Sequence, residues 1–161
     1  MLKVFSCSAE FLSKMTHEFL DERYSGIRNI GDAYDEGKLK LNELAIIYTK
    51  KTPVFMIENW LNGLLVYLNF EAQREDYQMS QLAKYIYEDL HFMNLQEITL
   101  FFRYVKRGKY GEFYGRIDPV KMLIWCREFR QERGNCISKL PIEYESEVIK
   151  KAKEEYLKSK V

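Results

Sequence analysis

The segment from Thr52 to Leu68 constrains the fold more than any other part of this sequence. Its large apolar side chains recur every three or four residues around much of the helical circumference, which predicts a helix buried on most sides. Thr52 and Pro53 form a typical helix start, because a threonine cap is followed by a first-turn proline. The apolar positions are Met56, Ile57, Trp60, Leu61, Leu64, Leu65 and Leu68. We expect this segment to be the central buried helix, with Trp60 in the core.

Helical periodicity also dominates the rest of the chain, and strand signals are scarce. Further helices are predicted over residues 8–23, 28–36, 42–50, 80–91, 94–107 and 119–133. Gly134 is expected to end the last of these, since glycine often follows a helix C-terminus. The turn 110–117 leaves room for one short β-hairpin around Gly115. The sequence therefore predicts an all-α fold, a single-domain helical bundle of about five to seven helices.

Length and composition divide the chain into a body and a tail. The 161 residues suit one domain with its own core, which we place at residues 1–140. Residues 141–161 carry glutamate and lysine at helical distances and are predicted to form a charged C-terminal helix or tail. Three cysteines without metal-type spacing, and no signal peptide, indicate free thiols in a reducing cytoplasm. The longest apolar run is broken by polar residues, so no membrane span is expected.

The net charge of +1 conceals a strong local imbalance. Residues 1–100 contain 10 lysines and arginines against 15 acidic residues, whereas residues 101–133 contain 9 against 4. A local excess of positive charge can attract phosphate or an acidic partner, although an ordinary solvated helix face has the same composition. The basic segment is therefore where the sequence points to a binding surface.

The basic segment starts in a helix with well-marked ends. Asn94 and Glu97 have the spacing of a capping box, and Gly108 suits the position after a helix that favours positive φ. The apolar face of this helix consists of Ile98, Phe101, Phe102 and Val105. The opposite face, expected to be exposed to solvent, carries Gln96, Thr99, Arg103 and Arg107.

Cations and aromatic rings gather around the glycine-rich turn that follows. We predict a contact surface for a protein partner, or for DNA or RNA, made of Arg103, Lys106, Arg107, Lys109, Tyr110, Tyr114 and Arg116. Lysine and arginine bind phosphate, while aromatic rings stack on bases. Gly108 and Gly111 also give the G-x-x-G form of KH domains, but those domains need flanking strands. The structural alternative is that the glycines permit a tight return and the aromatic rings hold the turn against the body.

No pattern in the sequence assigns an enzymatic activity. Glycine motifs for phosphate or dinucleotide binding are missing, and acidic pairs such as Asp32 and Asp35 have no adjacent base or nucleophile. Two isolated histidines, His17 and His91, and three scattered thiols do not make a zinc site. We expect no cofactor, no metal and no catalytic residue, and we interpret both histidines as packing or surface residues.

Part of the chain resembles a known family. A Trp-Leu-Asn helix, the run EITLFFRYVKRGKYGEFYGRIDP and a helix ending in FRQER resemble small uncharacterised proteins encoded by phages and mobile elements of Bacteroides-type bacteria. The resemblance spans roughly residues 42–133 and is most specific over residues 100–119. It implies a helical protein of the host bacterial cytoplasm, and it brings no activity or catalytic residue.

The sequence supports three functions. The first is a non-enzymatic accessory or adaptor protein that binds a replication, transcription or defence complex. The second is direct nucleic-acid binding through the basic and aromatic turn, residues 103–116. The third is a structural or assembly role, including self-association.

Overall fold

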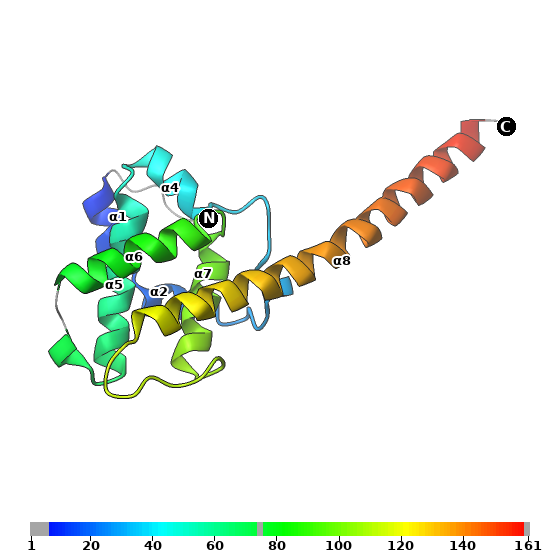
Figure 1. Ribbon diagram of the computed structural model, residues 1–161. Coiled ribbons are helices and arrows are strands. Elements are labelled where there is room, and N and C mark those ends of the chain that lie inside the picture. Colours follow the sequence, from blue (N-terminus) through cyan, green and yellow to red (C-terminus); the bar gives the residue numbers. More distant parts are fainter. Residues whose placement is uncertain (1–6, 74–75, 160–161) are drawn as a thin grey trace.

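Helices joined by turns and loops make up the described part of the chain (Figure 1). The computed structural model describes residues 7–73 and 76–159, and for residues 76 and 140–147 it describes the backbone alone. The elements are α1 Ser8–Lys14, α2 His17–Arg23, α3 Ile30–Ala33, α4 Leu41–Ile47, α5 Thr52–Tyr67, the 3-10 helix η1 Glu71–Gln73, α6 Asp76–Leu90, α7 Leu95–Lys106 and α8 Pro119–Ser159. No strand occurs among these residues, which confirms the all-α class.

The described residues contain nine helices, which exceeds the predicted five to seven. The predicted helix 8–23 is split, because the backbone of Met15 leaves the helical range with a ψ of 57°. Thr16 then starts α2 by accepting a hydrogen bond from the Phe19 amide at 3.2 Å. The predicted helix 28–36 shortens to the single turn α3, and η1 adds another short element.

The β-hairpin considered for residues 110–117 does not form, because the backbone of this loop has other partners. Gly111 and Gly115 adopt positive φ values of 135° and 74°, which interrupt an extended run. The side chain of Gln73 bonds both backbone groups of Ile117, accepting from its amide at 2.5 Å and donating to its carbonyl at 2.7 Å. The loop is therefore tied to η1 instead of to a second strand.

The core is built from side chains of several helices, chiefly α5, α6, α7 and α8, and Trp60 on α5 contacts Phe102 on α7. Trp60 and its apolar neighbours on α5 are buried as predicted, apart from half-buried Leu68. Eight of the twelve residues of α7 are buried, against eight of sixteen in α5, so α7 is the more enclosed helix. Thr99 was expected to face solvent but is only 1% exposed, because α2 packs against that side of α7.

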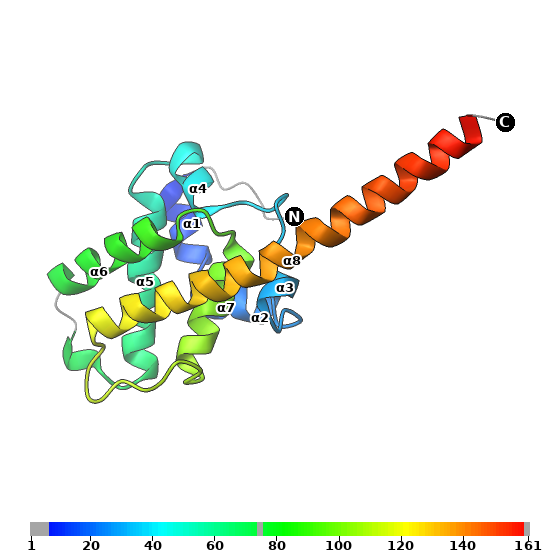
Figure 2. The same ribbon diagram turned by 45° about the vertical axis from the view of Figure 1, so that its right-hand side comes forward.

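Helix α8 is continuous from Pro119 to Ser159, so the predicted stop at Gly134 is wrong. A glycine inside a helix costs only about 1 kcal/mol, and Arg133 and Cys136 still pack against the body beside it. Cys136 is the last described side chain of α8 that packs against the core. Beyond it α8 projects away from the other helices (Figures 1 and 2), and Lys160 and Val161 of the predicted tail lie outside the described residues.

None of the described helices combines the length and apolar content that a membrane crossing needs.

Candidate contact surface

The seven residues of the predicted contact surface lie around the C-terminal end of α7 and the loop that leads to α8. Arg103 and Lys106 belong to the last turns of α7, and Arg107 is its C-cap. The loop carries Lys109, Tyr110, Tyr114 and Arg116. Proximity in sequence does not give these side chains one common surface, because each has a different set of neighbours.

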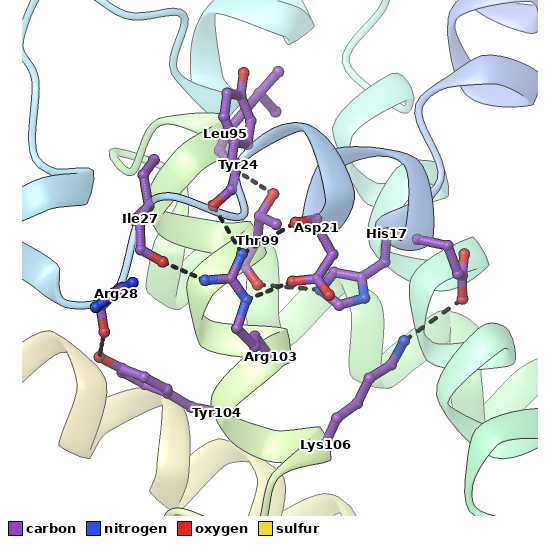
Figure 3. A network of polar contacts seen from close by, with 11 residues as sticks. His17, Asp21, Tyr24, Ile27, Arg28, Leu95, Thr99, Arg103, Tyr104 and Lys106 are labelled. Atoms are coloured by element: carbon purple, nitrogen blue, oxygen red, sulfur yellow. Dashed lines mark hydrogen bonds and ion pairs between the residues drawn. The ribbon is translucent and has the colours of Figure 1, made fainter.

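Arg103 is bonded inside the protein (Figure 3). Its Nε donates to Oδ1 of Asp21 at 2.5 Å. Its Nη atoms donate to the backbone carbonyls of Asp21, Tyr24 and Ile27. The last carbonyls of a helix have no partner within it, and here one guanidinium binds those at the end of α2 and in the turn that follows. Arg103 therefore holds α2 and its turn against α7.

Lys106 is also engaged within the chain. Its Nζ lies 3.5 Å from Oε1 of Glu18, and its side chain is only 15% exposed. The ammonium group also lies 5.2 Å from the centre of the Tyr67 ring, within the range of a cation–π contact. Like Arg103, it joins α7 to its neighbouring helices.

Lys109 and Tyr110 fix the loop against α8. Lys109 Nζ donates to Oε2 of Glu132 at 2.7 Å and lies 3.9 Å from the centre of the Tyr104 ring. Tyr110 stacks on Trp125, with ring centroids 6.3 Å apart. Burial is the main reason that the pKa of Tyr110 is raised. These contacts favour the structural role that the sequence left as an alternative for the aromatic residues of the turn.

The remaining three residues are exposed, but they line separate hollows. Arg107 borders a hollow of about 370 Å³ beside Arg28 and a second one, of about 550 Å³, beside Gly111. Tyr114, which is 82% exposed, and Arg116 line another of about 420 Å³ near Lys121. These three side chains form no hydrogen bond or ion pair within the described residues.

Both ends of α7 have the local structure that the sequence predicts. The Glu97 amide donates to the Asn94 side chain at 2.8 Å, and the Asn94 amide donates back to Glu97 Oε1 at 3.1 Å, which completes the capping box. At the other end Gly108 has a φ of 73°, and the amides of Gly108 and Lys109 donate to the carbonyls of Val105 and Tyr104. That pair of bonds is a Schellman ending.

One residue of this region was missed by sequence reasoning. Arg133 on α8 donates through Nε to the buried carboxylate of Glu97, and its guanidinium lies 4.8 Å from the centre of the Phe92 ring. Asn94 extends the same cluster by donating to the carbonyl of Ala33 at 3.0 Å. The start of α7 is thereby linked to α3 and α8. No local signal marks Arg133, because Glu97 lies 36 residues away along the chain.

The titratable groups with the largest shifts are enclosed. His17 is 2% exposed, and its Nε2 donates to the carbonyl of Thr99 at 3.1 Å. The rings of Trp60 and Phe102 lie 5.3 and 5.7 Å away, and burial together with the charge of Lys106 lowers the pKa of His17 to about 4. A neutral imidazole in this position is a packing group.

The thiol of Cys126 is equally inaccessible. Its side chain is fully buried, and burial raises its pKa well above the ordinary value. Over the described residues, no group of three or more histidines, cysteines, aspartates and glutamates is placed to hold a metal ion. The pKa shifts of His17 and Cys126 are therefore explained mainly by their burial in the core.

The projecting part of α8 carries a feature that the sequence analysis did not identify. Every described side chain from Val148 to Ser159 is exposed. At 3.6 residues per turn, Val148, Ile149, Ala152 and Tyr156 fall within roughly a third of the helix circumference. We call these four residues the α8 stripe. The spacing is visible in the sequence, but glutamate and lysine around it give the segment the appearance of a uniformly solvated helix.

The fold defines an all-α protein in which a body of packed helices carries one long projecting helix. Comparison with protein-family models, with curated protein sequences and with solved structures finds no match to this chain. The resemblance to proteins of phages and mobile elements therefore stays a prediction.

Proposed function

We propose that this chain is a non-enzymatic accessory protein, an adaptor that binds a protein partner through the projecting part of α8. The α8 stripe is the observation that carries the proposal. Val148, Ile149 and Tyr156 are about half exposed or more, and none of them belongs to the described hydrophobic core. Apolar side chains aligned on one side of a helix are what a partner helix buries in a helix–helix interface.

Helix energetics support the same proposal. Tertiary packing of an apolar face provides most of the stability of helices in proteins, and an isolated helix of a few turns is marginal in water. The segment beyond Cys136 has no such packing among the described residues. A partner helix lying along the α8 stripe would supply it. The polar flanks, which carry Lys153 and Glu155, would then lie at the rim of the interface.

The ion pairs formed by the cations of the basic turn favour an adaptor over a nucleic-acid binder. Arg103, Lys106 and Lys109 are paired with Asp21, Glu18 and Glu132. Each internal pair neutralises a charge that would otherwise attract phosphate. What the turn provides instead is a stable connection between α7 and α8, which orients the long helix.

Affinity capture with matched variants tests this proposal. Tagged wild-type protein is compared with an Ile149→Glu, Tyr156→Glu variant and with a Lys150→Glu, Lys158→Glu control, which alters the other side of the same helix. The source of partners is a lysate of a Bacteroides-type host, following the resemblance of the sequence. The captured protein is identified, purified and titrated against all three proteins by calorimetry.

We expect one protein to bind the wild type and the control but not the stripe variant. Equal capture by all three proteins would reject the α8 stripe as the contact. Light scattering of the free protein addresses the assembly role: a dimer that the stripe variant converts to a monomer would make this a self-associating structural protein instead of an adaptor.

Direct nucleic-acid binding is the second candidate, and one observation favours it. Tyr114, Arg116 and Lys121 surround the same hollow of about 420 Å³, with the tyrosine ring largely exposed. An exposed ring between two cations is suited to stacking on a base next to bound phosphates.

Fluorescence anisotropy with labelled single- and double-stranded DNA and RNA tests this second candidate. Salt-dependent binding that an Arg116→Glu, Lys121→Glu variant abolishes would establish it, because released counterions make phosphate binding sensitive to salt. If none of the labelled DNA or RNA molecules bound at low salt, direct nucleic-acid binding would be rejected.

A further inference from the structure

A groove between α5 and α6 forms a surface that neither the basic turn nor the α8 stripe includes. Its volume is about 590 Å³. The first turn of α5 and the first half of α6 provide most of its lining, which consists of Lys50, Lys51, Val54, Phe55, Tyr77, Ser80, Gln81, Lys84 and Tyr85. Residues some thirty positions apart meet here, since α5 and α6 pack against each other.

The polar part of this groove is rich in positively charged hydrogen-bond donors. Lys50, Lys51 and Lys84 are all exposed, and none of them forms an ion pair within the described residues. No carboxylate belongs to the described lining. An ammonium group has three donors and no acceptor, so this side of the groove is matched by a ligand that supplies negatively charged oxygen acceptors.

The apolar part is built from aromatic rings. Phe55 and Tyr85 are more than two-fifths exposed and Tyr77 is 76% exposed, while Val54 is half-buried between the helices. Tyrosine and phenylalanine in an accessible groove are typical of surfaces that receive an apolar side chain of a partner. The groove therefore combines an apolar floor with a rim of lysines that form no ion pair with any side chain the structure describes.

We propose that this groove binds an acidic, amphipathic segment of a protein partner. Carboxylates of the segment face Lys50, Lys51 and Lys84, and an aliphatic or aromatic side chain lies among Phe55, Tyr77 and Tyr85. The site is independent of the α8 stripe, so either can exist without the other.

Charge favours a peptide over a nucleic acid as the occupant. Residues 1–100, which contain the whole groove, carry an excess of five acidic residues. Such surroundings repel a polyanion, which needs a continuous track of cations along its backbone. A short segment with a few carboxylates needs only the local lysines, and its apolar side chain uses the aromatic floor that a phosphate backbone would leave empty.

The experiment is a selection of displayed random peptides of about a dozen residues on the full-length protein. Enriched peptides are synthesised with a fluorescent label and titrated against four proteins at physiological salt. These are the wild type, a Lys51→Glu, Lys84→Glu variant, a Phe55→Ser, Tyr77→Ser variant and a Lys38→Glu, Lys139→Glu control with the same charge change elsewhere on the surface. Circular dichroism establishes that each is folded. Labelled oligothymidine is titrated in parallel.

We expect the enriched peptides to carry net negative charge and at least one large apolar residue. Both groove variants should bind them at least about tenfold more weakly than the wild type and the control do. Loss in the lysine variant alone would indicate plain charge attraction and overturn the proposal. So would a selection without acidic enrichment, or oligothymidine binding that the lysine variant abolishes.

Discussion

At the scale of single residues, the guanidinium of Arg103 acts as a cap for the C-terminal end of α2, because it donates hydrogen bonds to backbone carbonyls there. It faces three backbone carbonyls at and after the C-terminal end of α2, together with the carboxylate of Asp21. Its neighbour Arg107 has no such partners among the described residues and is exposed. Two arginines one turn apart on the same helix thus have different roles, which only the surrounding fold determines.

Replacing Arg103 should therefore destabilise the protein, whereas replacing Arg107 should not. We expect Arg103→Ala to lower the free energy of unfolding by roughly 1.5–3 kcal/mol, the range for hydrogen bonds to a charged group. Arg107→Ala should stay within about 0.5 kcal/mol of the wild type, as exposed substitutions usually do. Urea unfolding followed by circular dichroism measures both, and equal midpoints for the two variants would contradict the assigned role of Arg103.

His17 makes stability depend on pH. The pKa of His17 is about 4 in the folded protein and about 6.5 in an unfolded chain, because burial disfavours the imidazolium. Between these values the unfolded state binds more protons than the folded state. The contribution of neutral His17 to the free energy of unfolding is therefore fully present above pH 6.5 and is lost as the pH falls towards 4. Within that window the loss should approach roughly 1.4 kcal/mol per pH unit.

The contribution of His17 can be isolated by substitution. His17→Gln should flatten the dependence of unfolding free energy on pH between 6.5 and 4, whatever its effect on stability at neutral pH. His91→Gln serves as a control, since His91 is exposed. If His17→Gln and the wild type lost stability equally over this range, His17 would not be the titrating group.

At the scale of elements, the packing of α5 against the rest of the core depends on Trp60. The indole is 2% exposed, stands edge-on to Phe102 at 5.3 Å and donates to the carbonyl of Met15 at 2.9 Å. We expect Trp60→Ala to cost about 3–5 kcal/mol, as large core truncations do. Lys109→Ala should cost under about 1 kcal/mol, because its ion pair is substantially exposed to solvent. An unchanged unfolding midpoint for Trp60→Ala would mean that α5 is not in the core.

The elements that were predicted correctly are those with local signals. The Asn94–Glu97 box and the positive φ of Gly108 depend on residues a few positions apart. The start of α5 was placed correctly, with Pro53 in its first turn, but Thr52 is not its cap: Lys51 holds that position and Thr52 is the first helical residue. Gly134 was misjudged because its local preference is weak, and packing on both sides of it keeps α8 helical.

The candidate site was less predictable than the fold, because its contacts are distant in sequence. Arg103 reaches partners 76 to 82 residues away, and Lys109 pairs with a residue 23 positions ahead. A cluster of cations in the sequence therefore does not reveal which of them are already paired. The lysines of the α5–α6 groove were overlooked for the converse reason, since they come from separate helices within an acidic half of the chain.

At the scale of the whole molecule, the body should fold without the end of α8. Side chains from Val148 to Ser159 are exposed and contribute nothing to the core. A chain that ends after Glu147 should keep an unfolding free energy within about 0.5 kcal/mol of the full-length value. Thermal and urea unfolding provide the comparison. A clearly less stable truncated protein would show that the projecting segment packs on the body or on a second copy.

We propose that a different protein covers the α8 stripe, and site-specific cross-linking in cells can capture that protein. A photo-reactive amino acid is placed at Ile149 in one protein and at Lys150, on the polar side, in another. We expect irradiation to give one adduct with a different protein from position 149 and none from position 150. Equal adducts from both positions, or an adduct only with a second copy of this chain, would contradict the claim.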